Sequence, residues 1–424
     1  MPTKKSITFA GRNCQKQMKT TNKLHPILCA AAVAMIATLI SCSPKSATSD
    51  NIIPIDLDAV AELMRQEDGF DPDEATNIND CDIIDNVEYV RLETSDEALI
   101  GDVHKIIVTE DRIFAADLEQ FQYCHIFDRK GKFIKKLNRR GRAGNEYTYL
   151  ADIFYNPDNQ TINLLGRYKA KILSFDKDGN EVAVHGELPA EFTSMEYHNG
   201  KYYGATSGLS PEKCDSCYLV VMNGKFEIEK CLVKNGYDGR HLSNDSFYLY
   251  DGDIFFANNW LMQVIDPKSK ETRWEFDFGS YRRPKELDDS KRYFEYIDKN
   301  RTLSMKVKDV HKISESKNYI VCEFDFITRI IGIYNKQTKS SNVAVATYIE
   351  QPYALPFGDI CSIGEGRIIS TIQASSVARL QRGSDAYGND FTEMFPEQVK
   401  RLQADFPPIN DDDNPFIAIY TLKE

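Results

Sequence analysis

The sequence predicts an all-β protein, a six-bladed β-propeller whose ring is closed by pairing strands from the two ends of the chain. First, a strand end, an Asp-x-x-Gly turn and a second strand at residues 126–134 recur at residues 173–182. Second, hairpin turns follow one another in pairs through most of the chain. Third, residues 414–422 form a last strand with nothing after it, whereas residues 87–92 form an early strand with nothing before it.

The inner hairpins are predicted from turn residues that precede apolar, alternating strands. Six such turns occur, at residues 109–112, 157–160, 198–201, 251–253, 315–318 and 364–367. Their nearly regular recurrence, with one supersecondary unit for each repeat, is typical of a propeller. Two β-sandwiches would also be all-β, but they predict neither regular hairpin pairs nor an exchange of terminal strands.

The outer hairpins number one fewer than the inner ones. Their turns lie at residues 128–131, 176–179, 223–224, 266–269 and 335–339. Asp suits the first position of a type I turn and Gly supplies positive φ, so these motifs favour tight hairpins. The missing partner strand is explained if residues 416–422 pair with residues 87–92, which completes the sixth blade and removes an exposed edge.

Short helical insertions are expected between some strands. Tyr293, Phe294 and Ile297 lie at helical spacing within residues 285–305, and residues 392–404 show a similar pattern despite Pro396. A short helix is also expected at residues 57–65, before the first strand.

The N-terminus predicts export and a lipid anchor. Six cationic residues and no acidic residue precede an uncharged run at residues 27–40, which is short for a membrane span. This run ends in Leu39-Ile40-Ser41-Cys42, a pattern similar to the bacterial lipobox, in which the cysteine is acylated after cleavage. A plain signal peptide or an N-terminal membrane helix is the alternative. We therefore expect a signal peptide at residues 1–41, a tether with a short helix at 42–82 and the propeller at 83–424.

The net charge of the chain limits the kinds of partner that it can bind. The chain has 52 Lys and Arg against 64 Asp and Glu, and loss of six cations with the signal peptide changes its formal charge from −12 to −18. Such an acidic surface disfavours nucleic acid. The expected contact with the membrane is the lipid on Cys42. We place the protein at the outer membrane, on the periplasmic side in preference to the cell surface.

Four stretches carry a resemblance to a known family. They are residues 87–94, residues 100–106, residues 127–133 running into 140–147, and residues 413–420. In this order they resemble the six-bladed β-propeller lipoproteins of Bacteroidota, which are related to NHL-like and TolB-like propellers. Members often have Gly-Pro-Gly-Glu-Tyr where this chain has Ala143-Gly144-Asn145-Glu146-Tyr147. The resemblance implies the fold and export, and it implies little about mechanism.

The densest positive charge lies between Arg129 and Arg142. Its second half forms a loop between blades, and such loops surround one mouth of the central channel. Guanidinium groups bind carboxylate, sulfate or phosphate with paired hydrogen bonds. The candidate ligand-binding residues are Arg139, Arg140, Arg142, Glu146 and Tyr147. The alternative, which we favour, is that Arg142, Glu146 and Tyr147 join neighbouring blades.

No catalytic or metal-binding motif is recognised, and neither a metal nor another cofactor is predicted. The seven His residues form neither HxH nor HExxH, and no GxSxG, Walker A or GxGxxG motif occurs. Cys214-Asp215-Ser216-Cys217 lacks further ligands, so a local disulfide or two thiols are expected. We therefore favour a binding or scaffolding module for a glycan or an envelope protein. An enzyme of lactonase or glycan-lyase type acting at the channel mouth is the alternative.

Overall fold

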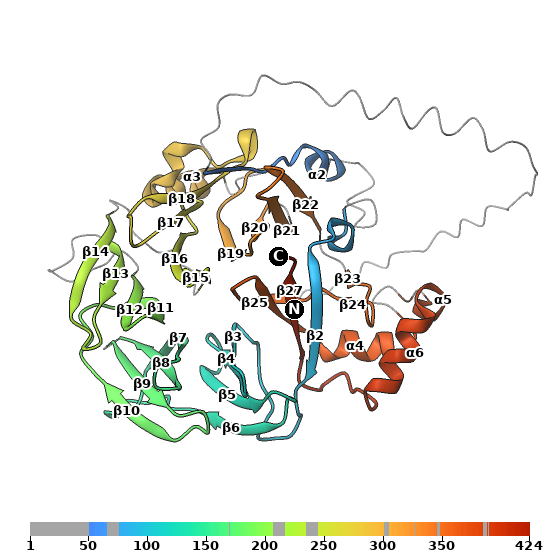
Figure 1. Ribbon diagram of the computed structural model, residues 1–424, viewed down its shortest axis with the longest axis horizontal. Helices are drawn as coiled ribbons and strands as arrows, with labels where there is room; N and C mark the ends of the chain where they lie inside the picture. Colours follow the sequence, from blue (N-terminus) through green and yellow to red (C-terminus); the bar gives the residue numbers. More distant parts are fainter. Residues whose placement is uncertain are drawn as a thin grey trace, which may run out of the picture. The chain divides into compact units, whose positions relative to one another are not determined.

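The computed structural model describes residues 51–65, 76–168, 170–206, 217–234, 245–300, 305–326, 328–345, 348–384, 388 and 390–424. These residues form a ring of six β-sheets around a common axis, as Figure 1 shows. The expected six-bladed propeller is confirmed. The predicted signal peptide at 1–41 and the lipidation site Cys42 lie outside the described residues.

Within each of the first three blades, consecutive strands are antiparallel neighbours. Blade 1 contains β3 (Lys105–Val108), β4 (Arg112–Asp117), β5 (Tyr123–Asp128) and β6 (Phe133–Leu137). Blade 2 contains β7 (Tyr149–Asn156), β8 (Thr161–Arg167), β9 (Lys171–Phe175) and β10 (Glu181–His185). Blade 3 contains β11 (Phe192–His198), β12 (Lys201–Thr206), β13 (Cys217–Met222) and β14 (Ile228–Lys234).

The remaining blades complete the ring. Blade 4 contains β15 (Phe247–Tyr250), β16 (Asp253–Asn258), β17 (Gln263–Ile265) and β18 (Thr272–Asp277). Blade 5 contains β19 (Val310–Glu315), β20 (Tyr319–Asp325), β21 (Arg329–Asn335) and β22 (Ser340–Ala344). Blade 6 contains β25 (Asp359–Gly364), β26 (Arg367–Ile372), β27 (Phe416–Leu422) and β2 (Ile84–Arg91). Apolar clusters fill the spaces between adjacent blades.

The ring closes as the sequence predicts, where the last strand meets the first part of the chain. β2 pairs antiparallel with β27, with Val87 opposite Tyr420 and Arg91 opposite Phe416. β27 is almost completely buried, since it lies between β26 and β2. β27 is therefore an interior strand of blade 6, with no unpaired edge.

The repeated outer turns have the geometry expected from their residues. In blade 1 the Asp128 carboxylate accepts the backbone N–H groups of Lys130 and Lys132, and Gly131 has φ +83°. In blade 2 the Asp176 carboxylate accepts those of Asp178 and Asn180 in the same way. A Cβ at residue 131 would meet the Arg91 carbonyl oxygen at 2.0 Å, so glycine also permits the close approach of β2.

Part of the segment assigned to the tether belongs to the ring. β1 (Ile52–Pro54) pairs parallel with β18 and adds a fifth strand to blade 4. Ile53, Ile55 and Leu57 alternate along the chain and are each at most 4% exposed. The polar residues around them resemble a linker, so this short alternation is hard to recognise in the sequence. The first strand therefore begins at Ile52, before the predicted start of the propeller. The predicted short helix follows as α2 (Asp58–Leu63).

The other insertions are helical, with two differences from expectation. Residues 285–305 contain a 3₁₀ turn (η4, Lys285–Asp288) and α3 (Ser290–Asn300), as predicted. The single helix expected at 392–404 is divided into α5 (Phe391–Met394) and α6 (Pro396–Asp405), since Pro396 starts a new helix. The sequence pattern missed α4 (Ala374–Gln381), which packs with α6 beside blade 6.

Minor elements complete the described fold. They are a small hairpin of β23 (Tyr348–Ile349) and β24 (Leu355–Pro356), and two short 3₁₀ turns, η2 (Ile78–Cys81) and η3 (Gly279–Tyr281). None of the described helices has both the length and the apolar character needed to cross a membrane.

Of the cysteines near the predicted local disulfide, Cys217 is buried and Cys231 is disulfide-bonded. Cys214 itself lies outside the described residues. Burial raises the pKa of Cys361 to about 11, and it also raises the pKa of Cys124 and Cys322. Such buried thiols are poor nucleophiles, so these three do not suggest catalysis.

Candidate functional site: the central channel

A cavity of about 420 Å³ lies along the inner strands of the propeller. Its walls come from five blades: β3, the end of β7, β11, the region around β15, and the β25–β26 hairpin. It extends to the inner hairpin turns, where Asn199 and Glu365 are exposed. This volume is within the range of about 300–1,000 Å³ that is usual for small-molecule sites.

A buried ion pair joins blade 1 to blade 2 beside the cavity. Lys105 Nζ lies 2.7 Å from Asp152 Oδ1, and the Asp152 side chain is completely buried. The two Asp152 oxygens also accept the backbone N–H groups of Ile153 and Met195. Burial opposes the charge of Lys105, but the nearby carboxylates of Asp152, Glu196 and Asp245 raise its pKa.

Glu196 is the second notable group of the channel. It lies in the middle of β11, and its Oε1 accepts the backbone N–H of Tyr197 at 3.2 Å. Burial raises the pKa of Glu196 to about 7, with Asp152 acting in the same direction and Lys105 against it. A carboxyl group that titrates near neutrality can exchange a proton with a ligand or bind a ligand cation.

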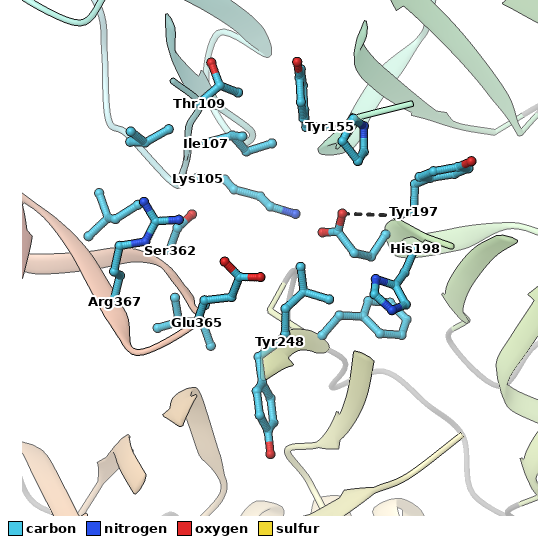
Figure 2. Close-up of a pocket in the computed structure, with 18 of the residues that line it drawn as sticks. Lys105, Ile107, Thr109, Tyr155, Tyr197, His198, Tyr248, Ser362, Glu365 and Arg367 are labelled. Carbon is cyan, nitrogen blue, oxygen red and sulfur yellow. Dashed lines mark hydrogen bonds between the residues drawn. The ribbon is translucent and has the colours of Figure 1, made fainter. Parts of the chain in front are cut away.

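The rim of the cavity is polar and partly aromatic. Tyr197 donates a hydrogen bond to Asp158, and His198 Nε2 lies 3.0 Å from the carbonyl oxygen of Gly252. Figure 2 shows Lys105, from blade 1, and Glu365, from the neighbouring blade 6, both pointing toward the centre of the cavity. Hydroxyl, carboxylate and aromatic groups around one hollow are suited to hydrogen bonding and stacking with a polar ligand.

A second buried charge cluster lies between blades 4 and 5 and is saturated by its own partners. Glu315, whose side chain is completely buried, is 2.7 Å from both Arg273 and Lys336. Its other oxygen accepts the Tyr248 hydroxyl at 2.8 Å and the Trp274 indole N–H at 3.2 Å. Because these groups already surround the carboxylate, the cluster stabilises the blade contact and leaves no position for a ligand.

The predicted arginine loop lies away from this cavity, beyond the other end of the blade 1 strands. Tyr147 is buried and donates a hydrogen bond to the carbonyl oxygen of Gln122 at 2.5 Å, which ties the loop to blade 1. Glu146 accepts the backbone N–H of Ala143, and Arg139 lies 3.4 Å from Glu181. Arg140 and Arg142 are exposed. Ligand binding by this loop therefore stays a prediction. Tyr147 and Glu146 make hydrogen bonds within the protein that stabilise the loop.

One further cluster could hold a divalent cation. Asp309, His311 and Asp325, at the open end of the β19–β20 hairpin, place ligand atoms within 4.8 Å of one another. Glu323, opposite His311 in the ladder, lies 3.4 Å from the His311 Nδ1 atom. Carboxylate and imidazole are ordinary ligands of such ions. Sequence analysis missed this group because its members come together through strand pairing.

The channel residues were also missed. Lys105, Glu196 and Glu365 are far apart in the sequence and form no motif. For Lys105 and Glu196, the signal that could have found them is a charged residue in an inner strand, where an apolar residue is usual. The sequence shows these positions, but it does not show which side chain of each strand faces the axis.

The family model described as "Domain of unknown function (DUF4934)" matches residues 67–421. The solved structure of a "Putative exported protein (BF0058)" from Bacteroides fragilis NCTC 9343 is similar, with a TM-score of 0.64 and 15% identity over 88% of this chain and 100% of that chain. U3-55K matches less well, with a TM-score of 0.41 and 11% identity over 68% of this chain and 78% of that chain. No curated protein matches.

Proposed function

The chain belongs to the DUF4934 family, and from this premise we propose that it is an exported, lipid-anchored propeller that binds a ligand in its central channel. Its role is that of a binding or scaffolding module of the cell envelope, for a carbohydrate or a protein segment. The observation that carries this proposal is the cavity of about 420 Å³, lined by polar side chains from five blades.

Export and anchoring are supported by two observations. The segment ending at Cys42 resembles a lipobox, and a protein with the same fold is described as exported. The location we propose is the outer membrane, on the periplasmic side. The similarity to NHL-like and TolB-like propellers belongs to the same proposal.

A glycan array combined with capture of envelope proteins tests the binding role. The variant Glu196→Gln together with Ser362→Leu alters two channel walls, and Glu191→Gln is a matched exposed control. A ligand that is lost with the channel variant and retained with the control supports the proposal. If every ligand is retained by the channel variant, the binding site lies elsewhere.

A second candidate function is an enzyme at the same site. The specific observation in its favour is Glu196, whose pKa is raised to about 7 and therefore suits a general acid or base. Incubation of any bound glycan or lactone with the protein, followed by mass spectrometry, separates the two functions. Product formation that disappears in Glu196→Gln indicates an enzyme, whereas an unchanged ligand indicates a binding module.

A further inference from the structure

We propose that the channel binds its ligand through a primary ammonium group and that the Glu196 carboxylate is the counter-ion. This inference rests on the proposed function, because it specifies the ligand chemistry of the same cavity.

Most of the channel charges are already matched within the protein. Lys105 is paired with Asp152 at 2.7 Å, and Lys312 on blade 5 is paired with Asp245 at 2.5 Å. Asp158 at the rim accepts the hydroxyl of Tyr197. Lys105 and Lys312 are therefore committed to carboxylates other than that of Glu196.

Glu196 is left without a dedicated cation. Among the described residues it takes part in no ion pair within 4.0 Å, and its one hydrogen bond comes from the backbone N–H of Tyr197. Counting the charges that line or directly support the cavity gives five carboxylates and three cations. They are Asp152, Asp158, Glu196, Asp245 and Glu365 against Lys105, Lys312 and Arg367. This excess of negative charge favours a cation and disfavours an anion.

Protonation of Glu196 gives the inference a measurable signature. The titratable and charged groups around the same cavity are Lys105 on β3, Asp152 on β7, Asp245 before β15, Glu365 at the β25–β26 turn, Arg367 on β26, and Asp158, Tyr197 and His198 at the rim. Burial raises the pKa of Glu196 to about 7. A ligand ammonium beside it favours the charged carboxylate and so lowers this pKa, which releases a proton on binding near neutral pH.

The ammonium could come from an amino sugar or from an alkylamine, and matched probes distinguish these sources. We would titrate the purified protein by calorimetry with methyl 2-amino-2-deoxy glycosides of common hexoses, with the corresponding methyl glycosides that carry a 2-hydroxyl group, and with cadaverine. The first two sets differ only in an ammonium or a hydroxyl group. Cadaverine presents the ammonium without a sugar ring.

The expected result is binding of an amine at least tenfold tighter than its hydroxyl analogue. Glu196→Gln should abolish this difference, and the exposed control Glu191→Gln should preserve it. Because the ionised fraction of Glu196 rises between pH 6 and pH 8, the affinity for an amine should rise by about tenfold over that interval. Preference for the glycoside over cadaverine identifies an amino-sugar ligand, and the reverse order identifies an alkylamine.

Carboxyl-carbon NMR of the wild-type protein gives a test that does not depend on a variant. Addition of the amine should lower the measured pKa of Glu196 by at least one unit. Equal binding of amine and hydroxyl analogues, an unchanged Glu196 pKa, or full retention of amine binding by Glu196→Gln would overturn the inference. Failure of the proposed function is distinct, because then no array ligand of any charge would respond to the Glu196→Gln and Ser362→Leu variant.

Discussion

The hydroxyl of Tyr420 in the last strand donates a hydrogen bond to the carbonyl oxygen of Phe357 at 2.8 Å, and their rings stack with centroids 4.7 Å apart. Tyr420 also lies opposite Val87 across the closing pair of strands. The buried Tyr420 side chain therefore connects β27, which closes the ring, to the segment around Phe357 that precedes β25.

Replacement of Tyr420 should destabilise the whole ring. Tyr420→Ala should cost about 3–5 kcal/mol because it leaves a cavity in a completely buried position. Tyr420→Phe should cost about 1 kcal/mol because it removes only the hydrogen bond. Urea denaturation measures both, with the exposed Tyr168→Phe as a control. Equal stability of Tyr420→Ala and the native protein would contradict the closure described here.

The Glu315 cluster predicts a dependence of stability on pH. Burial alone would raise the pKa of Glu315, but Arg273 and Lys336 outweigh it, so the pKa is lower in the folded protein. The resulting stability is present above the unfolded pKa of about 4.3 and is lost as pH falls through the folded pKa.

Glu315→Gln should test this contribution. It leaves Arg273 and Lys336 without their buried counter-ion and should cost about 3–5 kcal/mol near pH 7. The difference in free energy of unfolding between the native protein and the variant should shrink as pH is lowered below about 4. Glu365→Gln, at an exposed position, is the control. A difference that stays constant with pH would show that the cation pairing of Glu315 does not stabilise the fold.

Variants in the arginine loop should show whether its residues contribute to stability or to ligand binding. Arg140 and Arg142 are exposed, so the double variant to Ala should change stability by less than about 0.5 kcal/mol. Tyr147→Ala, at a buried position, should cost about 3–5 kcal/mol. Thermal unfolding measures both changes. If the loop binds an anion, the double variant should no longer bind sulfated or uronic-acid glycans. If binding of these glycans is unchanged, the loop has a structural role only.

The lipid anchor can be tested at one residue. Cys42→Ser should abolish incorporation of labelled palmitate and move the protein from the detergent phase to the aqueous phase of a Triton X-114 extraction. Cys81→Ser is the control. Labelling that persists in Cys42→Ser would exclude this cysteine as the acylated residue.

Much of the fold could be predicted because turn chemistry is local. The Asp128 and Asp176 turns need only a carboxylate and a glycine at fixed spacing, and both have the expected hydrogen bonds. Ring closure could be predicted because two unpaired strands must find partners. β1 was missed, since a three-residue strand leaves too short an alternation to distinguish from a tether.

The candidate site could not be predicted in the same way. Its residues come from five blades that are far apart in the sequence, so no local motif contains them. Whether Glu196 faces the axis or a neighbouring blade depends on strand register, and β11 contains a register shift between Phe192 and Ser194. The Arg139–Arg142 run was conspicuous because it places three arginines within four residues, yet the nearby Tyr147 is an interior residue.

The most direct test of the account is a crystal structure of the protein with the tightest-binding amine from the calorimetric panel. The account predicts that the ammonium lies inside the channel, within hydrogen-bond distance of the Glu196 carboxylate. Electron density for the ligand at the Arg139–Arg142 loop, or anywhere outside the channel, would contradict it.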